Sequence, residues 1–95
     1  MNTSNTSNSK EVWDALSNEM PDDLIIDMLF EEAIGYLEYD DANPDVGMGM
    51  FHRTALQHAE KDVSLAATRW RRNIHITDAI REQVLKRISE ARRRK

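Results

Sequence analysis

The sequence predicts an all-α fold, a small bundle of three to four helices built on a helical hairpin. Apolar residues recur at helical spacing in four segments, and proline, glycine and asparagine separate these segments. The chain has 95 residues and no cysteine, so packing between helices has to hold the fold together. Because a domain of this size has little surface to bury, we expect it to form a dimer or a higher oligomer.

The chain divides into a short tail and one helical domain. Residues 1–9 repeat asparagine, threonine and serine without an apolar run that could offset the entropy of ordering them, which predicts a disordered tail. Residues 10–95 form the predicted domain. Its helices are expected over about 10–19, 22–39, 48–73 and 78–93.

Local chemistry sets the predicted helix boundaries. Ser9 can cap the first helix, and Pro21 ends that helix and suits the opening turn of the next. Residues 40–47 contain Asn-Pro and glycine, which are typical of the turn of a helical hairpin. Thr77 is placed to cap the last helix, but the sequence leaves open whether the third and fourth helices are separate or form one kinked rod.

The helix predicted over 22–39 is the most apolar part of the chain, and the other helices are expected to pack around it. Eleven of the seventeen residues from Asp23 to Tyr39 are apolar and cover most of the helix circumference. Alanines on the following helix allow its bulky side chains to approach closely. A second apolar flank is left for the other helices or for a second molecule, and this candidate oligomer interface comprises Ile26, Phe30, Ile34 and Leu37.

Charge is distributed unevenly along the chain. Residues 1–50 contain twelve acidic residues and one lysine, whereas residues 51–95 contain five acidic and twelve basic residues. The net charge is only −4, because the two halves largely cancel. Such polarity can be satisfied within one chain, between two copies, or by a different partner, and the sequence leaves all three open.

Each half of the chain supplies a candidate partner-binding face. The acidic set recurs at helical spacing and comprises Asp23, Asp27, Glu31 and Glu38. The basic set comprises Arg69, Arg71, Arg72, Arg92, Arg93, Arg94 and Lys95. The ordinary role of both sets is a solvated helix face. A protein partner or a second copy can bind either set, and the basic set can also contact nucleic-acid phosphates.

Two polar residues interrupt the apolar faces. Glu32 falls among the apolar residues of the helix over 22–39, and His52 falls in the apolar stripe of the next helix. Because an isolated buried carboxylate is costly, we expect Glu32 and His52 to be a buried, mutually satisfied polar pair. A catalytic or ligand-binding acid and base is the alternative interpretation.

The sequence contains no complete metal-binding or catalytic motif. None of the three histidines is preceded by the Glu-x-x-His spacing of di-iron bundles. Asp41-x-Asn43-x-Asp45 has the alternation that opens a calcium loop, but Val46 replaces the required glycine and His52 the required glutamate. Cysteine is absent, and no serine lies in a glycine-rich turn of the kind that activates a nucleophile. We therefore predict no metal, no cofactor and no enzymatic activity.

These observations favour a non-catalytic helical protein–protein interaction module: an adaptor, regulator or inhibitor that binds a protein partner or another copy of itself. A regulator that binds nucleic acid through the basic C-terminal helix is the alternative, and a metal-binding helical protein is a weaker one. No apolar run reaches the length of a secretory signal or a membrane span, so a cytoplasmic location is the expectation.

Overall fold

The computed structural model describes residues 19–43, 45 and 49–93. These residues form three α-helices and no strand, which confirms the all-α prediction for this part of the chain. The helices are α2 (Asp22–Ala42), α3 (His52–Arg69) and α4 (Asp78–Arg93). The helix predicted over 10–19 and the tail predicted over 1–9 lie outside the described residues, apart from Glu19.

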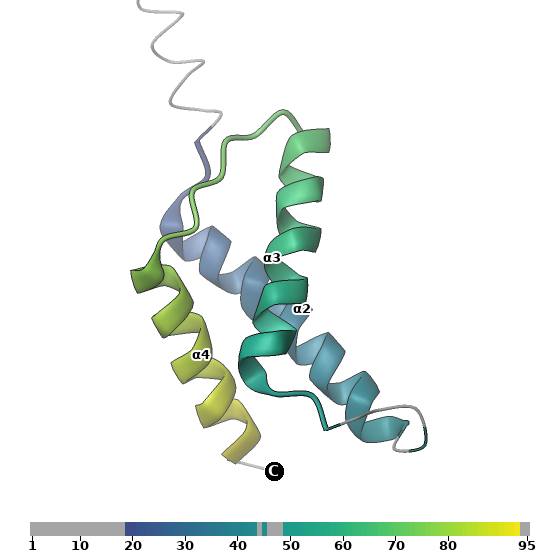
Figure 1. The fold of residues 1–95 in the computed structure, drawn as a ribbon. Helices are drawn as coiled ribbons and strands as arrows, with labels where there is room; N and C mark the ends of the chain where they lie inside the picture. Colours follow the sequence, from purple (N-terminus) through teal and green to yellow (C-terminus); the bar gives the residue numbers. More distant parts are fainter. Residues whose placement is uncertain (1–18, 44, 46–48, 94–95) are drawn as a thin grey trace, which may run out of the picture.

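The three helices are arranged in two layers, with α3 and α4 in front of α2 in the view of Figure 1. Helix α2 packs against both α3 and α4, which also touch each other. The predicted central role of this segment is therefore confirmed. Among the described residues, fourteen buried apolar side chains make the core: Met20, Ile25, Ile26, Leu29, Ala33, Leu37, Ala55, Leu56, Ala59, Val63, Ala67, Ile80, Val84 and Ile88.

Helix α2 extends three residues beyond its predicted end. Asp22 and Asp23 occupy its first turn, where negative charge complements the helix dipole. At the other end the backbone N–H of Asn43 still donates to Tyr39 O, so the helical turn continues through Ala42. Asn43 precedes a proline in the sequence, which disfavours helical geometry at Asn43 and ends the helix there.

Helix α3 is shorter at both ends than the predicted 48–73. It begins at His52, after an extended Phe51, and it ends at Arg69. The chain then adopts a Schellman motif, in which Arg72 N donates to Ala67 O at 2.8 Å and Arg71 N donates to Thr68 O at 3.1 Å. This motif needs a left-handed residue, which here is Arg71 with φ of 56°.

Helix α4 occupies the predicted range, and its predicted cap is confirmed. Thr77 Oγ1 accepts a hydrogen bond from Ile80 N at 3.2 Å. The connection from α3 to α4 runs beside the start of α2, because Met20 N donates to Asn73 O at 3.0 Å. Helices α3 and α4 are thus separate, a point that the sequence leaves open.

Candidate functional site

Helix α4 neutralises part of the acidic face of α2. Arg87 Nη1 lies 2.5 Å from Asp27 Oδ1, and Arg92 Nη2 lies 2.9 Å from Asp41 Oδ2. Both ion pairs join α2 to α4 of the same chain, so the acidic and basic halves meet within one molecule. Because the four side chains are partly exposed, each pair contributes on the order of 0–1 kcal/mol and mainly fixes the orientation of α4.

The rest of the predicted acidic set lies at the surface. Asp23, Glu31 and Glu38 are exposed residues of α2. Glu31 forms no ion pair with another described residue, whereas Glu38 does interact with a neighbour. The set therefore divides into a carboxylate held by α4, which is Asp27, and carboxylates that face outward.

The predicted basic set does not form one surface in the described part of the chain. Arg69, Arg71 and Arg72 are exposed at the end of α3, and Arg72 interacts with a neighbour. Arg92 is occupied by Asp41, and Arg93 is exposed at the end of α4. Arg94 and Lys95 lie outside the described residues.

The predicted burial of Glu32 is wrong. Glu32 is exposed and His52 is half-buried in the first turn of α3. Among the described residues no buried side-chain polar atom lacks a partner, so the core contains no carboxylate that needs a donor. The helical angle of Glu32 lies near those of buried residues, but α3 and α4 cover α2 around Leu29 and Ala33 and leave Glu32 at the edge of that contact.

The predicted oligomer interface is covered by α4 of the same chain. Ile26 and Leu37 are buried, and Phe30 and Ile34 are half-buried against the core. The guanidinium carbon of Arg87 lies 4.3 Å from the centre of the Phe30 ring, a cation–π contact over its outer face. These four side chains thus contribute to packing within the chain, and their predicted role in an oligomer interface stays a prediction.

A different surface of α2 is left uncovered by the other described helices, and no pattern in the sequence indicates it. Three hollows follow α2, and residues of α3 or of the segment just after it line two of them. The first, of about 590 Å³, is lined by Met20, Pro21, Leu24, Met28, Trp70 and Arg72. The second, of about 380 Å³, is lined by Asp27, Met28, Glu31, Glu32, Asp62, Val63, Ala66 and Trp70. The third, of about 590 Å³, is lined by Glu31, Glu32, Gly35, Tyr36 and Tyr39. Neighbouring hollows share lining residues, so together they form one surface, which we call the α2–α3 groove.

The groove carries large apolar side chains that the fold leaves exposed. Leu24 is 46% exposed, Tyr39 65% and Trp70 59%. Two other exposed apolar residues, Phe51 and Leu65, line none of the three hollows. Helix α3 ends one residue before Trp70, and Trp70 lies at the surface.

Tyr36 anchors the wall of the groove to α3. Its hydroxyl donates a hydrogen bond to Asp62 Oδ2, and its ring stacks on His58 with ring centres 5.0 Å apart. The hydrogen bond to Asp62 is the main cause that raises the pKa of Tyr36 above the ordinary tyrosine value; desolvation and the charges of Asp62 and Glu32 raise it further. The Tyr36 hydroxyl is therefore protonated at neutral pH, and its hydrogen bond connects α2 to α3.

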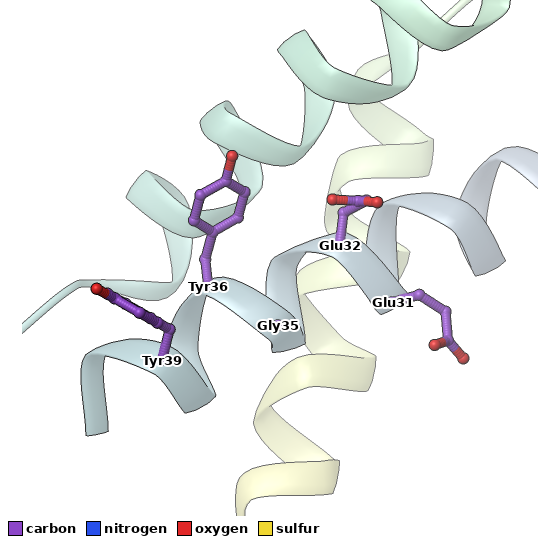
Figure 2. A pocket seen from close by; sticks show the side chains of 5 residues that line it. All are labelled: Glu31, Glu32, Gly35, Tyr36 and Tyr39. Atoms are coloured by element: carbon purple, nitrogen blue, oxygen red, sulfur yellow. The ribbon is translucent and has the colours of Figure 1, made fainter. Parts of the chain in front are cut away.

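Figure 2 shows the third hollow from close by. Tyr36 points from α2 toward α3, and Tyr39 lies beside it at the same end of the hollow. Glu31 and Glu32 stand at the other end with their carboxylates pointing in different directions. The bare backbone of Gly35 lies between the two pairs.

Neither metal ligation nor a membrane span is found in the described part of the chain. No three side chains of histidine, aspartate or glutamate there are placed to hold a metal ion together. No helix of that part is long and apolar enough to cross a bilayer.

Comparison of the chain with protein-family models, curated proteins and solved structures found no significant match.

Proposed function

We propose that this chain is a non-catalytic helical protein-interaction module that binds its partner in the α2–α3 groove. The groove itself is the observation that carries the proposal. It collects three strongly exposed apolar side chains, Leu24, Tyr39 and Trp70, on a face that the described helices leave uncovered. Contiguous apolar surface with a polar rim is typical of sites that bind other proteins.

A protein ligand suits this surface better than a small molecule does. The three hollows are shallow and follow a helix, whereas small-molecule sites are concave and enclose most of their ligand. A nucleic acid is less well matched, because acidic residues line the groove and Arg92 already pairs with Asp41. The cytoplasmic location and the self-association expected from the sequence remain part of this proposal.

Capture of a partner by two matched variants tests the proposal. Leu24→Ser/Tyr39→Ser removes exposed apolar surface from the groove, and Phe51→Ser/Leu65→Ser removes a similar surface from outside it. All four side chains are exposed, so both variants are expected to fold. Each immobilised protein is incubated with an extract of the source cells, and the retained proteins are quantified by mass spectrometry.

We expect a partner that the unmodified chain and the Phe51→Ser/Leu65→Ser variant retain equally, and that the groove variant retains at least about tenfold less, as loss of two interface anchors implies. Equal retention by both variants would contradict the proposal. Light scattering of the unmodified chain separately reports self-association, since a second copy in the groove would double the mass and the groove variant would be monomeric.

A further inference from the structure

The length and shape of the α2–α3 groove fit a helix. From Leu24 to Tyr39 it follows four turns of α2, about 22 Å at the rise of an α-helix. The described residues form only an isolated bridge between Glu19 and Asn73 and no sheet edge to which an extended peptide could add as a strand. An amphipathic helix that lays its apolar side along the groove is the mode of peptide recognition that fits this length.

Gly35 gives this groove a point of close approach. It lies inside α2, where glycine is less favourable than alanine because it loses more backbone entropy on folding. A methyl group built on Gly35 would meet no atom within 4 Å, so packing inside the chain does not require a glycine. Gly35 is exposed on α2, so its backbone can be approached by a second helix.

The rim of the groove beside Gly35 is negatively charged and not neutralised by the described residues. Glu31 and Glu32 are exposed and form no ion pair in that part of the chain. Asp62 adds a third carboxylate to the same wall. Charge complementarity therefore favours a partner helix with lysine or arginine beside its apolar stripe.

The chain's own basic helix cannot supply this partner. The apolar side chains of α4, Ile80, Val84 and Ile88, are fully buried in the core. A second copy could present α4 only by unfolding. The residues that precede Glu19 are also poorly matched, because Glu11 and Asp14 would bring further negative charge to the rim.

We infer that the α2–α3 groove binds a positively charged amphipathic helix of about four turns from a different protein. The helix crosses α2 closely at Gly35, places its apolar side against Leu24, Met28 and Trp70, and directs its cations toward Glu31 and Glu32. This inference rests on the proposed function and names the class of its partner.

Three synthetic peptides provide the probe. Each has about sixteen residues, a leucine stripe and a central alanine, and they differ only in their flanking residues: lysine, glutamine or glutamate. Binding of each fluorescently labelled peptide to the full chain is measured by anisotropy. We expect the lysine peptide to bind at least about tenfold tighter than the glutamine peptide, and the glutamate peptide to bind most weakly. Raising the salt concentration from about 50 to about 500 mM should reduce this preference.

Two charge-removing variants test whether the preference for the lysine peptide depends on the carboxylates of the groove. Glu31→Gln/Glu32→Gln should lower the affinity for the lysine peptide about three- to tenfold, the range expected for two exposed ion pairs. Glu82→Gln/Glu90→Gln changes the net charge equally on α4, outside the groove, and should leave the affinity within about twofold. An equal loss in both variants would show a non-specific charge effect and overturn the inference.

Gly35→Ala separates binding from folding. This substitution should raise the midpoint of thermal unfolding, because alanine is the better helix former. It should lower the affinity for the lysine peptide at least about fivefold, because the added methyl group blocks close approach of the two helices. Unchanged affinity would overturn the inferred crossing at Gly35.

Equal binding of the three peptides would reject the charged partner and leave the proposed function intact. Failure of all three to bind would reject the helical class of ligand. In that case, capture of an intact partner that the groove variant reduces would still support the proposed function. Equal capture by the groove variant and the unmodified chain would reject the proposed function as well.

Discussion

Tyr36 illustrates how a single residue connects the fold to the groove. It is half-buried, stacks on His58 and donates to Asp62, and it also lines the third hollow of the groove. Sequence periodicity correctly indicates that Tyr36 contributes to packing on α2. It does not indicate the partner of the hydroxyl, because that depends on how α3 is rotated against α2.

The Tyr36–Asp62 hydrogen bond gives a pH-dependent prediction. Because folding raises the pKa of Tyr36 from 10.0, protonated Tyr36 stabilises the fold fully below that value, and the stabilisation is lost as the pH rises through the higher folded value. In a Tyr39→Phe background Tyr36 is the only tyrosine. We expect Asp62→Asn to lower the midpoint of its phenolate absorbance titration. An unchanged midpoint would show that Asp62 is not the cause.

Glu32 and Gly35 show the limit of sequence reasoning at this scale. The helical angle of Glu32 predicts an inward position, but the edge of the α2–α3 contact runs past it and leaves the side chain exposed. Gly35 carries no side chain that periodicity could classify. Its significance depends on the empty space around it, which only the three-dimensional arrangement reveals.

At the scale of elements, the ends of α3 explain most differences between prediction and structure. The boundaries of α4 were predictable, because Thr77 supplies a recognisable cap. The C-terminal end of α3 was not, because its Schellman motif has Arg71 where glycine is the usual signal. Ending α3 at Arg69 also exposes Trp70 and thereby creates one end of the groove.

The left-handed backbone of Arg71 predicts an unusual gain in stability. A side chain in this conformation costs roughly 1–2 kcal/mol, and glycine removes that cost while adding entropy to the unfolded chain. Arg71→Gly should therefore stabilise the fold by about 0.5–1 kcal/mol in urea unfolding followed by circular dichroism. Arg69→Gly, inside the last turn of α3, is the control and should destabilise it by up to about 1 kcal/mol. Destabilisation by both substitutions would contradict the Schellman geometry.

At the scale of the whole molecule, the opposite charges of the two halves are partly satisfied inside one chain. Counts of charged residues reveal the two oppositely charged halves but not which side chains pair. The pairing depends on the direction in which α4 lies alongside α2. The Asp27–Arg87 and Asp41–Arg92 pairs show that direction. Within the basic half, Arg81 forms ion pairs with Glu60 of α3 and with Asp78 of its own helix. Its hydrogen bond with Glu60 is the main cause that raises the pKa of Arg81.

The same arrangement determines which surface remains for a partner. The apolar flank predicted to bind a second molecule is covered by α4, whereas the border with α3 is left open. Two helices, α3 and α4, cannot enclose a third that is apolar on most sides, so the part of α2 that they leave uncovered becomes the groove. The all-α class and the central position of α2 were therefore predictable, but the open side was not.

Backbone amide NMR shows which surface of the chain binds the peptide. The lysine peptide is titrated into the full chain, and shift changes are followed for each amide. We expect the largest changes along residues 24–39 of α2 and near the end of α3 around Trp70, with smaller changes in α4. Saturable changes that are largest on α4 would contradict a binding site in the α2–α3 groove. The absence of a saturable change in any helix, together with retained capture by the groove variant, would contradict it as well.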